Sequence, residues 1–403
     1  MMRVYATSVT AEVASDFNSN SLIVNYCVEF TDGCRLVDEL IVTYPIPISD
    51  LIDLTIICNY VVIFISQMFL LEGQISLVCD EKDIQNYCDI LKALYAIRNY
   101  QESVCIQAPH IKWIKYHNSA TVINSQKPKV LNLVSGGKDS LVSDILLTQN
   151  NALIKRCFLS GLNIGSSAYE RSACENLYDS FDVVELKGFD ILVNKLVEIS
   201  DCYGIPPTNN FIPKGRDLLT VIFSYPLAIY YNCNFISHGC EKDLWEKVVV
   251  KEGIEIPMHD SQCKLVMVPM SEQLFSATGI RLFSPIAGMH EIYILTWLLK
   301  NCPDYIQKMH SCFFEEWCGK CSKCLRYYLI QKQVGLNIIK FKNDPELQLL
   351  SLFEKLSNPN ANEKIGFFEE LKFLTGSNEY GQDLFAPTRS ELYPSFFERW
   401  ELE

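Results

Sequence analysis

The chain has little positive charge for its length. Its 403 residues include 35 Lys and Arg against 48 Asp and Glu, so the formal net charge is −13. An acidic surface repels the phosphate backbone of nucleic acids, which disfavours a general DNA- or RNA-coating protein. Small molecules and other proteins are therefore the expected partners, and no direct contact with nucleic acid is expected.

A secretion leader is also missing, because no basic, apolar, small-residue stretch precedes the 17 cysteines. Secretion is therefore disfavoured, and we expect a cytoplasmic protein whose thiols are mostly small buried side chains. Internal repeats and low-complexity tracts are absent as well. The content of 49% hydrophobic residues is ample for two or three folded domains.

One long run lacks formal charge. Residues 54–71 are 18 residues without Asp, Glu, Lys or Arg, which reaches the lower bound for a membrane-spanning helix. However, Asn59, Ser66 and Gln67 interrupt the run, and no nearby Lys or Arg would orient it in a bilayer. We expect a buried helix that packs in its own domain or against a partner, with no membrane contact. A membrane-spanning helix is the alternative.

Two sequence patterns divide the chain. Residues 1–125 begin with β-rich runs separated by turn residues, followed by the apolar run and an amphipathic helix at residues 83–100. They carry no chemical motif, and we predict an α+β accessory domain that docks a partner or substrate. Residues 126–340 alternate short apolar strands with helices, as is typical of a parallel α/β sheet. Residues 341–403 predict a helical C-terminal tail.

The alternating region defines the expected elements. Strands are expected at residues 130–134, 154–160, 182–186 and 234–239, and helices at residues 139–148, 168–178, 191–200 and 217–231. The stretch from residue 240 to residue 267 is less regular.

A glycine-rich loop, residues 135–140, joins the first of these strands to the first helix. Two glycines let the backbone approach an anion closely, and the helix that follows directs free N–H groups to the same point. The loop is neither a Walker A loop nor a G-x-G-x-x-G fingerprint. We predict a phosphate-binding loop, and the alternative is a helix start that Asp139 merely caps. The loop reads Ser135-Gly136-Gly137-Lys138-Asp139-Ser140.

A second group of residues has the spacing of metal ligands. Four thiols lie within 13 residues in the pattern C-x5-C-x2-C-x2-C, and they are Cys312, Cys318, Cys321 and Cys324. Four thiolates suit a tetrahedral zinc site, and closed ligation leaves no open position for catalysis. We therefore predict a structural zinc knot at residues 312–324. An iron–sulfur cluster and unligated core cysteines are the alternatives.

The glycine loop resembles the pyrophosphate loop of the N-type ATP pyrophosphatases, the PP-loop enzymes that cleave ATP between its α and β phosphates. This resemblance implies a parallel-sheet adenine-nucleotide alpha-hydrolase (HUP) fold with ATP and Mg²⁺ as cofactors. The whole loop would hold the departing pyrophosphate, and Asp139 would help to hold Mg²⁺. Lys138 and Asp139 are then candidate catalytic residues.

The four cysteines follow the loop by about 175 residues. This combination of motifs resembles the QueC family of 7-cyano-7-deazaguanine synthases. The resemblance covers residues 128–339. Residues 211–217 resemble a family segment in which Lys214 and Arg216 would neutralise phosphate charge, so Arg216 is also a catalytic candidate. Its alternative role is that of a surface arginine at a helix start. Gly239 lies where the next family strand ends and is a candidate nucleotide contact.

QueC enzymes adenylate 7-carboxy-7-deazaguanine, displace AMP with ammonia and form a nitrile with a second ATP. This chain departs from the family pattern at Lys138, where the family has a small or apolar residue. It also departs in residues 239–264, which replace the usual base-binding segment. Asp243, Trp245 and Asp260 are the candidates for contacting a deazaguanine base, and a solvated loop is the alternative.

Long QueC-like chains with added terminal segments resemble those of bacterial antiphage operons, the Qat and type IV CBASS groups. That resemblance implies that the carboxylate is joined to an amine of a partner protein. We therefore predict a QueC-like, AMP-forming carbon–nitrogen ligase. The alternatives are a biosynthetic synthase that uses ammonia, another pyrophosphatase-family enzyme such as a tRNA thiolase, and a non-catalytic zinc-stapled scaffold that binds ATP.

Overall fold

The structure is a computed structural model, and it describes most of the chain. The described residues are 6–15, 20–48, 52–102, 105–116, 127–163, 167–203, 215–246, 248–251, 254–257, 259, 261–312, 317–349 and 386–402.

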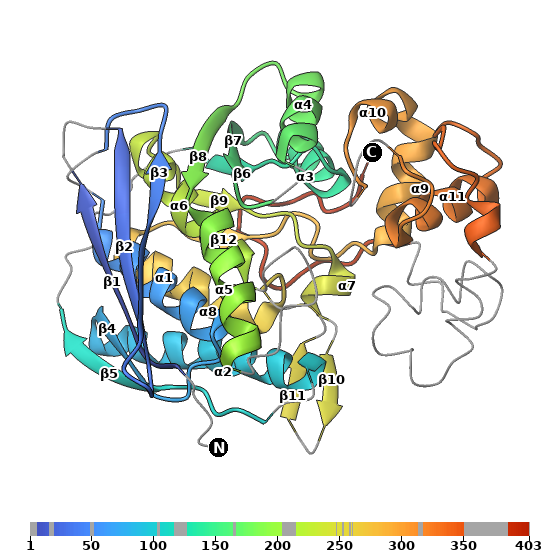
Figure 1. Ribbon diagram of the computed structural model, residues 1–403. Helices are drawn as coiled ribbons and strands as arrows, with labels where there is room; N and C mark the ends of the chain where they lie inside the picture. The colour runs from blue at the N-terminus through green and yellow to red at the C-terminus, as the bar shows by residue number, and fades with distance from the viewer. Residues whose placement is uncertain are drawn as a thin grey trace.

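Ten strands of the described residues form one mostly parallel sheet (Figure 1). Neighbouring strands run parallel from the first to the fifth and again across the last three, and the pairs between are antiparallel. The α/β class predicted from the sequence is confirmed. In spatial order the strands are β12 (Arg281–Phe283), β9 (Phe235–Ser237), β6 (Lys129–Leu133), β7 (Leu153–Ser160), β8 (Asp182–Lys187), β3 (Arg35–Thr43), β2 (Ser21–Phe30), β1 (Ala6–Ser15), β4 (Gln74–Cys79) and β5 (His110–Lys115).

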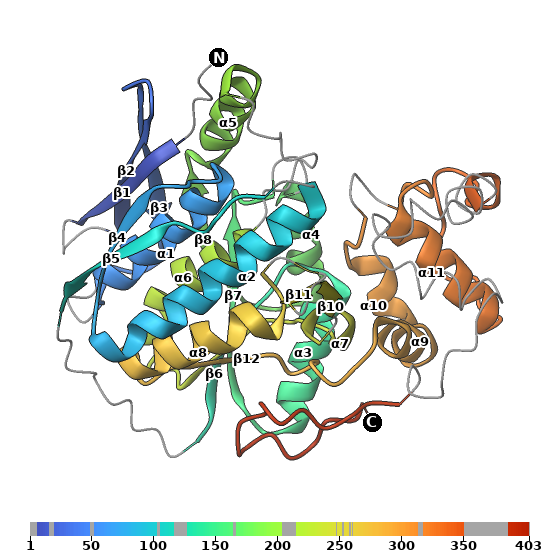
Figure 2. The same ribbon diagram turned by 90° about the horizontal axis from the view of Figure 1, so that it is seen from below.

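Helices cover both faces of this sheet. Successive residues of a strand point to opposite faces, so apolar residues on both sides of a strand need helices to bury them. In β6, Leu131 belongs to the main hydrophobic cluster, whereas Val130 belongs to a second cluster on the other face. Figure 2 shows two helices of the first face, α2 and α8, side by side. The first face is covered by α1 (Leu54–Met68), α2 (Ile84–Glu102), α5 (Phe189–Tyr203), α6 (Arg216–Tyr230) and α8 (Lys264–Thr278), and the second by α3 (Lys138–Gln149) and α4 (Ser167–Leu177).

The remaining described elements are a hairpin outside the large sheet and several short helices (Figure 1). Three helices form a group beside α3 and α4, and a short hairpin extends in another direction. The elements are α7 (Lys242–Trp245), β10 (Val248–Lys251), β11 (Ile254–Pro257), α9 (Glu291–Asn301), α10 (Pro303–Lys308) and α11 (Ser322–Gln333), with a single 3-10 turn, η1 (Glu81–Asp83), before α2.

The N-terminal strands continue the sheet of the α/β region. β3 pairs antiparallel with β8, with Ile41 opposite Lys187 and Thr43 opposite Glu185. Directly after β8, Gly188 has φ of +86°, and a Cβ there would lie 2.4 Å from the carbonyl oxygen of Glu39. Only glycine lets the two segments approach so closely. Within the described residues, the segment before residue 125 thus has neither a sheet nor a core of its own.

The uncharged run at residues 54–71 forms α1, a buried helix, as expected. Asp53 caps it by accepting a hydrogen bond from Thr55 N at 2.9 Å. Asn59, inside the helix, donates to the carbonyl of Val78 in β4 at 2.8 Å and accepts from its N–H at 3.0 Å. Its polar groups are therefore satisfied by neighbouring elements. No helix among the described residues is long and apolar enough to cross a membrane.

Some elements differ from the expectations. α8 already begins at Lys264, and it continues through Pro269. β5 was not predicted, because its polar sequence follows the pattern of an edge strand with mostly exposed side chains. Of the expected C-terminal tail, residues 350–385 lie outside the described residues. Residues 386–402 are irregular, and Phe397 packs in the second hydrophobic cluster.

Candidate functional site

The glycine loop lies at the point where the strand order reverses. β6 is flanked by β7 on one side and by β9 on the other. The chain passes from β6 through α3 to β7 and β8, and later returns to β9 and β12 on the opposite side. Loops that follow neighbouring strands diverge at such a point and leave a crevice, which is where ligands bind in open α/β sheets.

The first loop glycine is required by the backbone. Gly136 has φ of +69°, and a Cβ there would lie 2.6 Å from Cβ of Ala173 and 2.8 Å from the carbonyl oxygen of Glu170. Both contacts belong to α4, which packs directly on the loop. The carbonyl of Gly136 also accepts a hydrogen bond from the N–H of His310 at 2.8 Å. The loop is thus held between α4 and the segment that leads to the four cysteines.

Hydrogen bonds from Ser140 tighten the turn. Its hydroxyl donates to the carbonyl of Gly137 at 3.1 Å and accepts from the N–H of Ser135 at 3.3 Å. Gly137 is the N-cap residue of α3, so the free N–H groups of the helix start lie at the loop. This is the strand, loop and helix arrangement that the sequence predicted.

The loop after β9 meets the loop after β6. A Cβ on Gly239 would lie 3.0 Å from the carbonyl carbon and oxygen of Asp139, so a larger residue would push the two segments apart. The structure therefore brings Gly239 to the glycine loop.

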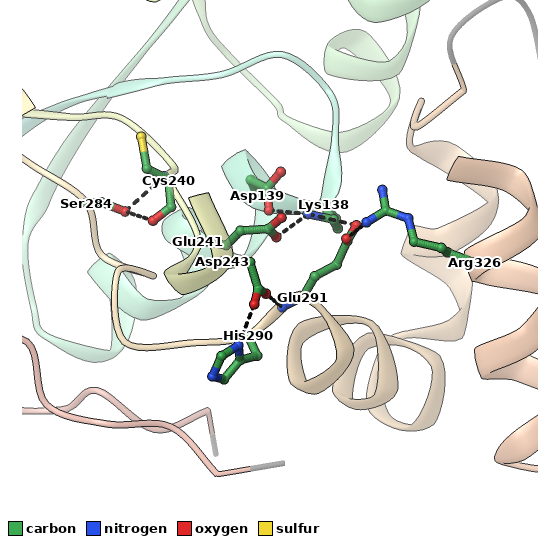
Figure 3. Close-up of polar contacts among 9 residues, drawn as sticks. All are labelled: Lys138, Asp139, Cys240, Glu241, Asp243, Ser284, His290, Glu291 and Arg326. Carbon is green, nitrogen blue, oxygen red and sulfur yellow. Dashed lines mark hydrogen bonds and ion pairs between the residues drawn. The ribbon is translucent and has the colours of Figure 1, made fainter. Parts of the chain in front are cut away.

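Lys138 is enclosed by carboxylates (Figure 3). Its Nζ lies 2.6 Å from Asp139 Oδ1, 2.5 Å from Glu241 Oε2 and 3.3 Å from Glu291 Oε1. Burial alone would lower the pKa of Lys138, but the charges of Asp139 and Glu241 raise it above its usual range. Lys138 is therefore a charged ammonium whose nearest neighbours are anions.

The charges extend from Lys138 to α11. Glu291, at the start of α9, also forms an ion pair with Arg326 of α11 (Figure 3). Glu241, Glu291 and Arg326 are each at most 2% exposed. We call Lys138, Glu241, Glu291 and Arg326 the buried charge network. It connects the glycine loop to the helix that follows the four cysteines.

Two candidates for base binding, Asp243 and Trp245, contact other parts of the protein and help to hold the fold together. Asp243 is close to His290 Nδ1 at 2.6 Å and accepts a hydrogen bond from the N–H of Glu291 at 2.9 Å, so it caps α9 (Figure 3). Trp245 is 5% exposed in the main hydrophobic cluster. Lys214 and Asp260 lie outside the described residues.

Arg216 and Asp217 begin α6, after Gly215 in the left-handed conformation. Asp217 accepts hydrogen bonds from Ser261 at 2.6 Å and Gln262 at 2.9 Å. Burial would raise the pKa of Asp217, but His238 and the charge of Arg216 lower it well below its usual range. Asp217 is therefore already engaged, whereas Nη1 of Arg216 is buried without a hydrogen-bond partner in the described part of the chain.

The four cysteines form one buried cluster. Their sulfur atoms all lie within 4.8 Å of one another, close enough to ligate a single metal ion such as zinc. Cys321 is the N-cap of α11, and its sulfur accepts a hydrogen bond from the N–H of Cys324 at 3.5 Å. The predicted grouping of these residues is confirmed.

Lys323 lies between two of these cysteines, Cys321 and Cys324, in the first turn of α11. Burial lowers the pKa of Lys323, and the charges of Lys138 and Arg216 lower it further. The carboxylates of Asp139 and Glu170 act in the opposite direction. The charges that act on the pKa of Lys323 therefore belong to the glycine loop and to the first turns of α4 and α6.

Sequence reasoning missed four charged residues of this site, namely Glu241, Glu291, Lys323 and Arg326. A signal existed for the last two, because Lys323 lies inside the final C-x2-C pair and Arg326 lies two residues after it. Cations beside metal ligands at a predicted phosphate site are candidates for anion contacts. The two glutamates had no such signal, since only the fold brings them to Lys138.

A family of unknown function, DUF6395, matches residues 270–348 of the chain. This range includes the four cysteines and also Glu291, Lys323 and Arg326. Among curated proteins, none matches the chain.

Proposed function

We propose that this chain is an ATP-dependent, AMP-forming carbon–nitrogen ligase of the QueC-like type with a HUP fold. It activates the carboxylate of a deazaguanine base and transfers the acyl group to an amine. The observation that carries this proposal is the Ser-Gly-Gly loop at the strand-order reversal, where the start of α3 and the loop after β9 converge. Such a loop provides backbone N–H donors for a pyrophosphate group.

The first step makes an acyl adenylate. A carboxylate oxygen of the base attacks the α-phosphorus of ATP, and the bond from that phosphorus to the oxygen that bridges to the β-phosphorus breaks. Pyrophosphate leaves with the electron pair. The glycine loop holds this leaving group, and the unpartnered Nη1 of Arg216 is a donor for its growing negative charge.

The second step forms the carbon–nitrogen bond. An amine nitrogen attacks the acyl carbon, the bond to AMP breaks, and the nitrogen loses a proton to solvent. We assign the amine to a partner protein because the long QueC-like chains imply such an acceptor. Free ammonia is the alternative acceptor, and the product distinguishes the two.

Asp139 is the residue that would help to hold Mg²⁺. Its Oδ1 faces Lys138, but its side chain remains 33% exposed, so a carboxylate oxygen can still be reached. The ion supplies charge neutralisation on the phosphates. A zinc ion at the four cysteines has a structural role.

The test is a mass-spectrometric assay with ATP, Mg²⁺ and 7-carboxy-7-deazaguanine, with and without ammonium. We expect AMP and pyrophosphate that depend on the base, and an activated base that awaits a protein amine. Free nitrile would favour the biosynthetic alternative. No base-dependent AMP would contradict the proposal and favour a scaffold.

A matched pair of variants connects the assay to the loop. Ser140→Ala removes the hydroxyl that bonds Ser135 and Gly137, and should lower AMP formation roughly 10-fold or more. Ser143→Ala changes a buried serine of the same helix whose hydroxyl has no partner within the described residues, so its activity should stay near that of the unaltered chain.

A further inference from the structure

We propose that a pocket between α1, α2 and α8 binds the primary ammonium group of a small alkylamine. The pocket is lined by the start of α1, the end of β4, η1, the first turn of α2 and the last turns of α8. Its volume is about 330 Å³, partly open to solvent, which is the lower end of the range for small-molecule sites. It shares no residue with the glycine loop or the buried charge network, so this inference does not rest on the proposed function.

The pocket lies at the carboxyl end of a second group of parallel strands. β1 pairs parallel with β4, and β4 pairs parallel with β5. The pairings of β8 with β3, β3 with β2 and β2 with β1 are antiparallel, so β4 and β5 run opposite to β6. Their carboxyl ends therefore lie at the end of the sheet away from the glycine loop. Loops at the carboxyl ends of parallel strands form the ligand sites of α/β sheets.

Three aspartates give this pocket a negative charge. Asp53, Asp80 and Asp83 line it together with the exposed Lys82. Asp83 is 5% exposed, and burial raises its pKa because neither the hydroxyl of Ser276 nor the ammonium of Lys82 fully offsets the loss of solvation. A cation bound beside Asp83 stabilises this carboxylate in its charged form.

A buried hydrogen-bond acceptor in α8 lines the same pocket. Gln273 is 2% exposed, and its Oε1 has no hydrogen-bond partner in the described part of the chain. Buried acceptors are nearly always bonded, so this oxygen calls for a donor. A primary ammonium group carries three N–H donors and no acceptor, which suits an amide oxygen in an acidic pocket.

The spacing of the carboxylates favours an organic cation over a metal ion. Among the described residues, the four cysteines are the only group of three or more His, Cys, Asp or Glu side chains close enough to share one metal ion. The three aspartates are therefore too far apart to coordinate a metal together. Tyr116 and Ala277 also line the pocket. An aromatic ring attracts a cation and an apolar side chain packs against a carbon chain, so an alkylammonium matches the lining.

The experiment measures binding of 1,4-diaminobutane to the full chain by calorimetry, without ATP. Asp83→Asn keeps the shape of the side chain and removes its charge, so it should weaken binding roughly 10-fold or more. Its thermal midpoint should not fall, because the raised pKa of Asp83 means that the buried charge destabilises the folded chain. Asp89→Asn changes an exposed aspartate of the same helix and should bind the diamine like the unaltered chain.

Gln273→Met tests the unpartnered acceptor. Methionine has a similar length but no carbonyl oxygen, so this variant should also bind the diamine roughly 10-fold more weakly. Absence of diamine binding, or equal affinities of the unaltered chain, Asp83→Asn and Gln273→Met, would overturn the inference.

Two further ligands test the chemistry of the pocket. Neither Ca²⁺ nor 1-butanol should compete with the diamine, because the first lacks N–H donors and the second lacks charge. Competition by either would contradict an ammonium site. Binding of Nα-acetyl-lysine amide but not of the diamine would replace the small amine by a lysine side chain of a protein. Base-dependent AMP formation is measured separately, so the proposed function stands or fails independently of these results.

Discussion

The side chain of Lys138 is enclosed by carboxylates from three separate parts of the sequence. Asp139 is its neighbour in the chain, whereas Glu241 and Glu291 are brought to it by the loop after β9 and by the start of α9. The sequence predicted the glycine loop itself because its residues are contiguous. It could not predict the partners of Lys138, since these depend on which strands are neighbours.

Removing one carboxylate should show how strongly this network is coupled to folding. Glu291→Gln leaves Lys138 and Arg326 with less counter-charge in a buried place, and should lower the free energy of unfolding by about 3–5 kcal/mol. Urea unfolding followed by tryptophan fluorescence measures it. Glu346→Gln removes a carboxylate from an exposed pair with Lys332 and should change the midpoint little. Equal midpoints for the two variants would contradict the interpretation.

Two of the positive-φ glycines, Gly136 and Gly33, form a matched pair. Gly33→Ala places a Cβ in open space and should cost about 1–2 kcal/mol from its left-handed backbone alone. Gly136→Ala carries that cost and also clashes with Ala173 and with the carbonyl of Glu170. It should therefore have the lower thermal midpoint and lose pyrophosphate binding. Equal thermal midpoints and equal pyrophosphate binding of the two variants would contradict the close packing of α4 against Gly136.

At the scale of elements, the sequence predicted most helices and strands of the α/β region. The expected strand at residues 130–134 corresponds to β6, and the expected helix at residues 139–148 to α3. The spacing of apolar residues that indicates a helix or a strand depends only on neighbouring residues, so it can be recognised in the sequence without knowledge of the fold. β5 escaped prediction because a half-exposed edge strand has little apolar pattern, and the first turns of α8 because Pro269 interrupts the helical signal.

The side chain of Asn59 in α1 makes the hydrogen bonds to β4 that a neighbouring strand would otherwise make. β1 pairs with β4 only near Gln74 and Ile75, and further along β4 the side-chain amide of Asn59 bonds both polar groups of Val78. Asn59→Leu should cost about 2–5 kcal/mol, because it leaves a backbone N–H and a carbonyl unsatisfied. Chemical denaturation measures this loss. Asn301→Leu, at the exposed end of α9, should have little effect, and a similar loss there would contradict the reasoning.

At the scale of the whole molecule, the sheet continues across the boundary that the sequence pattern suggested. Alternating β-rich runs predict strands but not their partners, so the pairing of β3 with β8 could not be read from the sequence. The N-terminal helix α1 packs against α6, whose first residue is Arg216. The N-terminal segment therefore supports a helix of the candidate site.

This continuity predicts cooperative unfolding. A fragment of residues 127–403 would expose the apolar faces of α6 and α8 and the edge of β8, and should aggregate or lack a cooperative transition. The full chain should show one transition, seen equally by Trp113 in β5 and by Trp297 in α9. Single-tryptophan variants separate the two signals. A soluble fragment with a sharp transition would show that the α/β region folds alone.

The pairing of β3 with β8 also has a consequence for synthesis on the ribosome. About 140 residues separate the end of β3 from the start of β8, so the edge of β3 emerges long before its partner. At typical translation rates this interval is roughly 10–30 s. During that time an unpaired strand edge is exposed in the nascent chain, and a chaperone that shields extended segments would have to act in this window.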